Sequence, residues 1–403
     1  MNQPGYDPDA MTMPLPDSEQ RTDAPPGSGA DLSKVGAVAI GRNEGERLKA
    51  CLESLVSAGL AQVVYVDSGS TDGSRSLATS LGVDVVELDL RFAFTAARAR
   101  NAGFERLMEL RDDVEFVQFV DGDCAVRDGW LAAAAAALRA DKELAGVTGR
   151  RRERYPDKSV YNLVCDMEWD APASDDAGWF GGDAMVRVKA LKQAEGYNPR
   201  VIAGEEPELC IRLRRDGWRI AILPREMTWH DAAMTRFGQW WKRSVRAGHA
   251  YRELATIHRS PDHTPFAREA LRPWLWLLGP PVAVAVATTV LAFVSPWLAS
   301  LGSLMLLGVY ALLILKSAKW RLSRGDEMKQ AVIWGVACTV GKLPEAVGQC
   351  VYWWNRWRGR DTTLIEYKGP PAPGRAPGSP PGSAPGNAGD QDPGNATTDK
   401  PAE

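Results

Sequence analysis

Residues 115–123 read Glu115-Phe-Val-Gln-Phe-Val-Asp121-Gly122-Asp123. The run from Phe116 to Val120 is short and mostly apolar, which is typical of a buried strand. Two carboxylates, one residue apart, follow it directly, and both can reach the same hard cation. Oxygen ligands of this kind suit Mg²⁺ or Mn²⁺. Because the same triplet also occurs in ordinary turns, its place at a strand end carries the prediction of a metal site.

The chain around this run alternates between two hydrophobic patterns. Short β-branched runs predict strands, and apolar residues at helical spacing predict helices between them. Such alternation predicts parallel βαβ units and a layered α/β sheet. Ligands bind such sheets at the carboxyl ends of the strands, where Asp67 and Asp121 both fall. The predicted strands are 35–40, 62–66, 83–88 and 115–120, and the predicted helices are 44–58, 74–81 and 95–110.

A long apolar segment follows in the second half of the chain. No charged residue occurs from Pro273 to Leu315. This length fits two membrane spans of about 20 residues each, with Ser295-Pro296 at the turn between them. The alternative is a buried hairpin in a soluble core, but soluble helices are seldom apolar all round. Lys and Arg residues flank both ends, so the positive-inside rule places both flanks in the cytoplasm.

A third apolar segment runs from Ala331 to Trp354. It contains Lys342, Pro344 and Glu345. These residues favour an interfacial or re-entrant helix over a complete span. Whether this segment crosses the membrane stays open at this point.

Composition and charge exclude several classes of protein. The net charge of −3 offers no bulk attraction for nucleic acid. Six cysteines without a C-x-x-C pair predict reduced, buried thiols in place of disulfides or a zinc site. The N-terminus lacks the pattern of a signal peptide, so we expect the globular part in the cytoplasm.

Changes in composition divide the chain into six segments. The two ends are rich in Pro and Gly and are predicted to be disordered. The segments are a disordered N-terminus (1–33), an α/β domain (34–256), a linker (257–272), a transmembrane helical hairpin (273–316), a basic loop with an interfacial or third membrane helix (317–368), and a disordered tail (369–403).

Three further motifs accompany the metal triplet. The first, Asp67-Ser-Gly-Ser-Thr-Asp72-Gly73, places a carboxylate where it can bind a base or ribose, or it is a plain loop with a helix cap. The second includes Arg100, which can pair with phosphate or lie on a solvated helix face. The third places three glutamates, Glu205, Glu206 and Glu208, before an amphipathic helix. They are either electrostatic partners of that helix end or a catalytic base.

The order of these motifs resembles family 2 glycosyltransferases of the GT-A fold. The resemblance covers roughly residues 34–250 and predicts a mostly parallel sheet flanked by helices. The matching segments are the opening strand with Arg42-Asn43-Glu44, the loop Asp67–Gly73, the helix start Arg100-Asn101-Ala102-Gly103, the triplet Asp121-Gly122-Asp123, the segment Phe180-Gly181-Gly182-Asp183, and Gly204-Glu-Glu-Pro-Glu-Leu209.

The resemblance implies a role for each matching residue. Asp67 would contact the nucleotide base, Arg100 a donor phosphate or a neighbouring carboxylate, and Asp121 ribose or metal. Asp123 would bind the metal, and His230 would be a third metal ligand or a structural histidine. The remaining implied positions are Asn43 and Glu44 for the nucleotide sugar, and Gly181, Gly182 and Asp183 on the acceptor side. Apart from the resemblance, Trp241 belongs to a group of Trp and Arg residues, with Trp240, Arg236, Arg243 and Arg246, that is expected to form an interfacial shelf beside the acceptor.

This chain departs from the family pattern at several positions. Glu206 stands where the family usually has an aspartate base, so Glu205 and Glu208 stay open as alternatives. Pro207 inside that element is unusual, and Asp183 replaces what is often Asn. The Gln-x-x-Arg-Trp motif of processive synthases is absent. We therefore expect single-sugar addition without polymer synthesis.

The expected function is that of a metal-dependent hexosyltransferase. An inverting reaction would move a sugar from a nucleotide-diphosphate donor to a hydroxyl acceptor. The acceptor would be a polyprenyl-linked glycan in cell-envelope or exopolysaccharide synthesis. The enzyme would cross the inner (cytoplasmic) membrane several times, with its catalytic domain in the cytoplasm.

Two other functions compete with this expectation. A nucleotidyltransferase would carry a Gly-rich phosphate loop after the first strand, and Arg42-Asn-Glu-Gly45 is a poor match to one. A catalytically inactive membrane scaffold would keep the fold but would not bind nucleotide diphosphates in a metal-dependent way.

Overall fold

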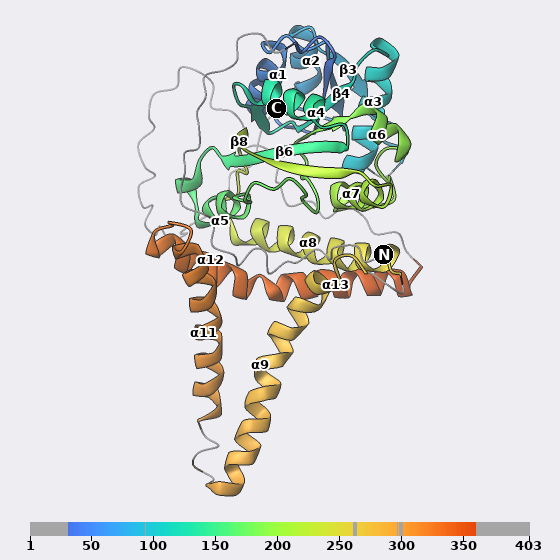
Figure 1. Cartoon of the computed structure of the whole chain (residues 1–403). Coiled ribbons are helices and arrows are strands. Elements are labelled where there is room, and N and C mark those ends of the chain that lie inside the picture. The colour runs from blue at the N-terminus through green and yellow to red at the C-terminus, as the bar shows by residue number, and fades with distance from the viewer. Residues whose placement is uncertain (1–30, 93, 261–263, 296, 298–300, 360–403) are drawn as a thin grey trace, which may run out of the picture. The chain divides into compact units, whose positions relative to one another are not determined.

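The computed structural model describes residues 31–92, 94–260, 264–295, 297 and 301–359 (Figure 1). The predictions of disorder for residues 1–30 and for the tail lie outside this range, as does Pro296 of the predicted hairpin turn. Strands and helices alternate in the first part of the chain as predicted. These elements are β1 (Val35–Gly41), α1 (Glu46–Val56), β2 (Gln62–Asp67), α2 (Ser74–Ser80), β3 (Asp84–Glu87), α3 (Ala96–Leu110) and β4 (Phe116–Asp121).

The strands form one mixed sheet in the order β3-β2-β1-β4-β7-β6-β8-β5. The first four strands in this order pair in parallel, while β7 lies antiparallel between β4 and β6. The later elements are β5 (Cys124–Val126), α4 (Trp130–Ala140), β6 (Leu144–Glu153), a 3₁₀ turn (Pro156–Lys158), α5 (Val160–Glu168), β7 (Ala184–Arg187), α6 (Val188–Gln193), α7 (Glu205–Arg215) and β8 (Arg219–His230).

Alternate residues of the central strands face opposite sides of the sheet. In β1, Val35, Ala37 and Ala39 belong to one buried cluster, and Val38 and Ile40 belong to the other. This period of two is what a strand imposes. Helices α1, α2 and α4 contribute to the first cluster, and α3, α6 and α7 contribute to the second. The sheet therefore lies between two helical layers.

Small residues bring α3 close to the sheet. A Cβ added at Gly103 would overlap the side chains of Val38 and Val66 on the strands beneath it. Thr95 caps the helix by accepting a hydrogen bond from the Arg98 amide at 3.1 Å. The close approach brings the N-terminal turns of α3, with Arg100, next to the carboxyl end of β4.

The remaining helices follow the sheet. Helix α8 (Phe237–Ile257) precedes two long apolar helices, α9 (Ala267–Val294) and α11 (Gly302–Leu322), which lie side by side (Figure 1). Helix α9 begins inside residues 257–272, which the sequence assigns to a linker. Ala267, Glu269, Ala270 and Leu271 all favour a helix, so the linker is shorter than predicted.

The third apolar segment forms two helices where the sequence predicts one. These are α12 (Met328–Val340) and α13 (Lys342–Trp357), which meet at Gly341. The break has a local cause, because Pro344 has no backbone N–H and fits only the first turn of a new helix. Neither helix is long enough to count among the candidate spans in the described chain.

Helices α8 and α13 pack very closely (Figure 1). A Cβ added at Gly248 would overlap the backbone of Glu345, and one added at Gly348 would overlap the carbonyl oxygen of Val245. The buried side chain of Gln349 accepts from Arg252 of α8 at 2.8 Å and from Trp274 of α9 at 2.9 Å. These contacts hold α8, α9 and α13 together.

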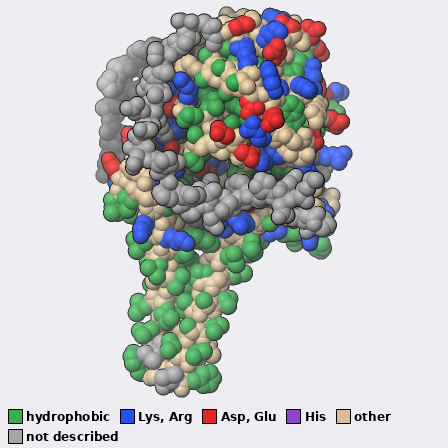
Figure 2. All heavy atoms as spheres, in the orientation of Figure 1, with side chains coloured by type: hydrophobic (Ala, Val, Ile, Leu, Met, Phe, Trp, Pro, Cys, Tyr) green, Lys and Arg blue, Asp and Glu red, His purple; other side chains and the backbone are tan. Residues whose placement is uncertain are grey.

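Helices α9 and α11 expose most of their apolar side chains. Two stretches are long and apolar enough to cross a membrane, Ala267–Phe293 with a mean hydropathy of 1.8 and Gly302–Leu322 with 1.4. Figure 2 shows hydrophobic side chains covering both helices, with Lys and Arg side chains gathered where they meet the rest of the protein. The apolar segment thus forms two exposed helices, which could form the predicted hairpin.

The six cysteines are all free. The prediction of buried thiols is wrong for Cys350, which is exposed, and Cys338 is only partly buried. The reason for Cys350 lies in the amphipathic character of α13. Its buried residues face α8 and α9, whereas Cys350 shares the outer face with Leu343, Val347 and Trp354.

Candidate active site

A cavity of about 590 Å³ lies at the carboxyl ends of β1 and β4. Its lining comes from parts of the chain that are distant in sequence. They are the loop after β1 (40–44 with Arg47), the start of α3 (Phe94, Ala96, Arg100), the metal triplet (121–123), Glu168 at the end of α5, the segment 179–181, the segment 203–207, and helix α8 with Phe266. The structure therefore brings residues of five of the six matching segments to one place, and the loop Asp67–Gly73 does not line the cavity.

Arg100 forms ion pairs with three carboxylates of the cavity. Its side chain is only 2% exposed and pairs with Asp121, Glu205 and Glu206, each at 2.9 Å. Burial alone would lower the pKa of Arg100, but these three carboxylates together hold it well above its ordinary value. The sequence predicts either a donor phosphate or a neighbouring carboxylate as the partner of Arg100, and the structure shows carboxylates.

Helix α7 presents two glutamates to this arginine. Gly204 precedes the helix with a φ of 81°, a conformation that glycine adopts without strain. Pro207 sits in the first turn, where no backbone donor is required. The positive helix end therefore lies beside the carboxylates of Glu205 and Glu206.

The three glutamates differ in their surroundings. Glu208 pairs with Arg212 at 2.7 Å and His258 at 3.1 Å and does not line the cavity. Glu205 lines it but is nearly fully buried, while Glu206 keeps 14% of its side chain exposed. Burial and the adjacent Glu205 carboxylate raise the pKa of Glu206 to about 7, despite Arg100. This geometry favours Glu206 as the group that can exchange a proton in the cavity.

A second arginine, Arg151 on β6, holds Asp121 from the other side. It contacts Asp121 at 3.3 Å and Asp183 at 3.0 Å. Asp183 is fully buried, accepts a hydrogen bond from the Asp121 amide at 3.0 Å and accepts another from Thr228 at 2.7 Å. Each oxygen of Asp121 therefore contacts one guanidinium group, and Asp121 still lines the cavity.

The four residues predicted on the acceptor side are separated in the structure. Gly181 lines the cavity, and Gly182 lets Asp121 approach, because a Cβ there would lie 2.6 Å from its carboxylate. Asp183 does not line the cavity. Its carboxylate is turned toward Arg151 and the backbone amide of Asp121. Trp241 also lies outside the lining, with its ring centroid 5.7 Å from that of Phe237.

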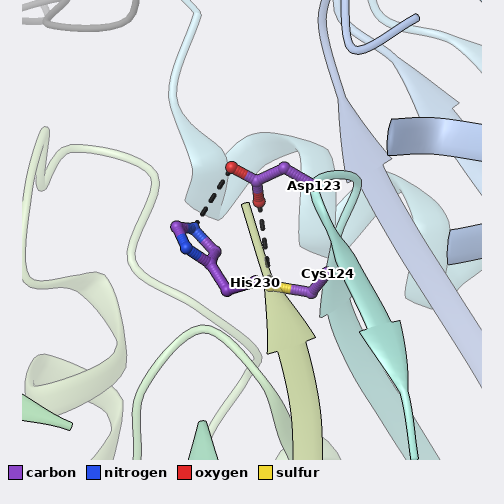
Figure 3. Close-up of side chains that lie close together, drawn as sticks. All are labelled: Asp123, Cys124 and His230. Carbon is purple, nitrogen blue, oxygen red and sulfur yellow. Dashed lines mark hydrogen bonds and ion pairs between the residues drawn. The ribbon is translucent and has the colours of Figure 1, made fainter. Parts of the chain in front are cut away.

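Asp123 and His230 point toward one another (Figure 3). The Asp123 carboxylate lies 3.2 Å from Nε2 of His230, and both residues are buried. Antiparallel pairing of β5 with β8 creates this contact, since Cys124 is paired directly with His230. Burial lowers the pKa of His230, which favours the neutral imidazole that a metal ligand requires.

Glu153 orients this histidine from behind. Its carboxylate lies 3.5 Å from Nδ1 of His230 and accepts hydrogen bonds from the amides of Tyr155 at 3.1 Å and Ala232 at 3.0 Å. A carboxylate that holds the second nitrogen of a ligand histidine is a recurring feature of metal sites. Such an arrangement fixes the ring so that Nε2 faces Asp123.

The Asp123–His230 pair fits a divalent cation. Adjacent ligands of six-coordinate Mg²⁺ or Mn²⁺ lie about 3 Å apart, given bonds of about 2.1 Å. Cys124 adds a sulfur atom to this group of close ligand atoms. Asp121, Cys124 and Asp183 form a second such group, but Arg151 already places a positive charge between its two carboxylates. The residues therefore fit a metal best at Asp123 and His230.

The predicted nucleotide loop is held to the loop after β1. Asp67 is buried and accepts hydrogen bonds from the amides of Gly69 at 3.0 Å and Ser70 at 2.8 Å. Asn43 accepts one from the Thr71 amide at 2.7 Å and adopts a φ of 56°, which Asn tolerates. Asp67 thus shapes its own loop and does not line the cavity, whereas Asn43 does.

Sequence reasoning misses Arg151 and Glu153. Both lie in the run Arg150-Arg151-Arg152-Glu153 at the end of β6. With Arg154, five consecutive charged residues at a strand end are a signal that could have identified them. Their partners, however, are Asp121 in β4, Asp183 just before β7 and His230 in β8, which no local pattern places beside β6.

Comparison with known proteins finds similarity over the sheet domain. Residues 38–193 match the sequence model of the family described as glycosyl transferase family 2. The chain is also 26% identical over 250 residues to the pre-mycofactocin glycosyltransferase of Mycobacterium tuberculosis, in two strains. That match covers 59% of this chain and 51% of the relative, so the chain spans about half the length of the curated relatives it matches.

A solved structure shares the fold. The mannosyltransferase from Pyrobaculum calidifontis, in complex with GDP-Man and Mn²⁺, aligns with a TM-score of 0.52 and 18% identity. The alignment covers 83% of this chain and 92% of the other. The mixed α/β sheet with flanking helices is therefore a GT-A fold, as the resemblance predicts.

Proposed function

We propose that this chain is a family 2 glycosyltransferase, which transfers a sugar from a nucleotide-diphosphate sugar to a hydroxyl group of an acceptor; the match of residues 38–193 to that family supports this. The observation that carries this proposal is the joint position of Arg100, Asp121, Asp123 and Glu206 around one cavity. A proton-accepting carboxylate and a candidate metal ligand there face the same space. In a single-displacement sugar transfer the first group can accept the acceptor proton, and the second can hold an ion that stabilises the leaving diphosphate.

Glu206 is the proposed base. It removes the proton from the acceptor hydroxyl, whose oxygen then forms a bond to the anomeric carbon. The bond from that carbon to the donor diphosphate breaks on the opposite face, so the anomeric centre is inverted. Arg100 holds Glu206 in place through its 2.9 Å ion pair and limits its rotation toward other partners.

Asp123 and His230 are the proposed metal ligands. A Mg²⁺ or Mn²⁺ ion held there would neutralise charge on the departing diphosphate. Glu153 orients His230, and the buried carboxylate of Asp183 holds the backbone of Asp121. Asn43 and Glu44, which line the cavity, and Asp121 are the proposed nucleotide-sugar contacts, and Asp67 supports them through its loop.

The acceptor is proposed to be lipid-linked. Support comes from the two exposed apolar helices and from the basic residues that flank them. In this proposal the helices cross the inner (cytoplasmic) membrane, the catalytic domain faces the cytoplasm, and the product enters cell-envelope or exopolysaccharide synthesis. Transfer of one hexose per cycle follows from the absence of the Gln-x-x-Arg-Trp motif.

A donor screen tests the function. Purified membranes that contain the protein are supplied with Mn²⁺ and a panel of nucleotide sugars, and the released nucleoside diphosphate is measured. We expect release with one donor, and loss of that release in Asp123→Ala and Glu206→Gln variants that still fold. Asp128→Asn, which removes an exposed carboxylate near the metal loop, is the control and should keep full activity. Full activity in both site variants would refute the assignment.

The pH dependence gives a second test of Glu206. Only the deprotonated carboxylate can accept a proton, and its pKa is raised to about 7. The rate should therefore decline below pH 7, by about tenfold for each unit well below that pKa. A rate that stays constant from pH 5 to pH 8 under chemistry-limited conditions would exclude Glu206 as the base.

A further inference from the structure

Helix α8 forms one wall of the cavity, and the proposed mechanism does not use it. The residues that it contributes recur at intervals of three and four, which places them on a single helix face. Two of them are arginines, and two are alanines that leave room above the helix. The lining residues of α8 are Arg243, Arg246, Ala247, Ala250, Tyr251 and Leu254.

Three other arginines that line the cavity form ion pairs with carboxylates, and Arg246 differs from them in this respect. Arg47 pairs with Glu44 at 2.8 Å, Arg100 pairs with three carboxylates, and Arg243 pairs with Glu168 at 2.6 Å. Within the part of the chain that the structure describes, no carboxylate lies within ion-pair distance of Arg246, although it lines the cavity. A partly exposed guanidinium in this position can bind an anion through two parallel hydrogen bonds.

An aromatic wall adjoins this arginine. Trp179, Tyr251 and Phe266 all line the cavity. The Trp179 and Phe266 ring centroids are 5.1 Å apart, and those of Tyr251 and Phe266 are 6.1 Å apart. Phe266 directly precedes the apolar helix α9. The wall therefore continues from the cavity toward the exposed apolar surface of that helix.

We propose that the acceptor carries a phosphate group that Arg246 binds, and that Trp179, Tyr251 and Phe266 contact the apolar part next to it. This rests on the proposed function in that the acceptor hydroxyl must reach Glu206. Arg246 lies on a different wall from the strand ends that carry Asn43 and the metal triplet. For this reason we assign it to the acceptor and not to the donor diphosphate.

Phosphate of this kind belongs either to a lipid headgroup or to a soluble phosphorylated compound. The test uses the full-length protein in non-ionic detergent micelles and titrates decyl phosphate, inorganic phosphate and decanol by calorimetry. Decyl phosphate should bind, and Arg246→Gln should weaken its binding by about tenfold or more, the usual effect of losing a charge-assisted hydrogen bond. Arg246→Lys, which keeps the charge, should recover part of the affinity.

Lys242→Gln is the matched control, because it removes an exposed positive charge from the same helix outside the cavity. It should bind decyl phosphate as the unmodified protein does, and decanol should not distinguish any of the variants. If inorganic phosphate binds as tightly and with the same dependence on Arg246, the source is a soluble phosphate. If only decyl phosphate does so, the source is a lipid headgroup.

Three results would overturn the proposal. One is unchanged binding of decyl phosphate to Arg246→Gln. Another is an equal loss in the Lys242→Gln control. The third is a loss of Mn²⁺-dependent UDP or GDP binding in Arg246→Gln, which would move Arg246 to the donor site. If Arg246→Gln does not fold, Arg246→Met is used as the test variant, because it keeps the apolar stem of the side chain and removes the charge. Failure of the transfer reaction itself would appear separately, as absent donor turnover with Arg246-dependent decyl phosphate binding intact.

Discussion

The helices that cover the sheet and the helices near the C-terminus treat apolar side chains in opposite ways. Leu48, Leu52 and Leu55 on α1 are fully buried. Val282, Val286 and Val290 on α9 have similar spacing, yet they are 60%, 60% and 59% exposed. Exposed apolar surface costs about 25 cal/mol per Å² in water. The difference teaches that the apolar face of α1 is covered by the sheet, whereas the described part of the chain leaves that of α9 uncovered.

Ion pairs within the sheet domain also differ in how deeply they are buried. Around the cavity, buried arginines pair with buried carboxylates, as Arg100 does with Glu205. On the rim of the sheet domain, pairs such as Arg106 with Asp84 stay partly exposed. Removing one arginine from each kind of pair tests how strongly burial affects the contribution of an ion pair to the free energy of unfolding.

The largest effect is expected for Arg100→Ala. It leaves three carboxylates together in a buried site and should lower the free energy of unfolding by about 3–5 kcal/mol. Arg106→Ala on the same helix removes partly exposed ion pairs with Asp84 and Glu109 and should have a much smaller effect, because solvent screens them. Thermal and urea unfolding of both variants give the comparison. Similar losses in the two would show that burial does not govern these pairs.

Val286→Arg tests the solvent around α9. At the centre of a bilayer an arginine costs about 2.5–3.5 kcal/mol on insertion scales, so this variant should shift protein out of the membrane fraction. Val286→Leu keeps the side chain apolar and should behave as the unmodified chain. Membrane fractionation followed by alkaline carbonate extraction measures the shift. If Val286→Arg stays in the membrane fraction as fully as Val286→Leu, α9 does not span the bilayer there.

Gly348→Ala tests the contact between α8 and α13. Its added methyl group would meet the backbone of Val245 and should destabilise the protein by about 1–3 kcal/mol through overpacking. Gly308→Ala on α11 provides the matched control, because nothing lies within 4 Å of an added Cβ there. That control should be neutral or stabilising by up to about 1 kcal/mol, since Ala favours a helix over Gly. Differential scanning fluorimetry in detergent distinguishes the two, and equal melting temperatures would count against the close crossing.

Local sequence patterns predict much of this protein. The alternation of strands and helices from residue 35 to residue 121 depends on hydrophobic periodicity, which neighbouring residues set. The metal triplet was recognisable because it follows an apolar strand directly. The charge-free run from Pro273 to Leu315 predicted two helices for the same reason. In each case the cause is the spacing of apolar residues along one or two helical turns or along one strand.

Contacts between distant segments decided the rest. Glu206 is the proposed base because His258, 50 residues further along the chain, holds Glu208 outside the cavity, and because Glu205 is more deeply buried than Glu206. Arg151 and Glu153 meet Asp121 and His230 only because β6 pairs with β7 and β8. No local pattern encodes such pairing, since it depends on which strands the folded sheet brings side by side. The sequence therefore predicted the strands and the metal triplet, whereas the tertiary structure alone determined how their charges are shared.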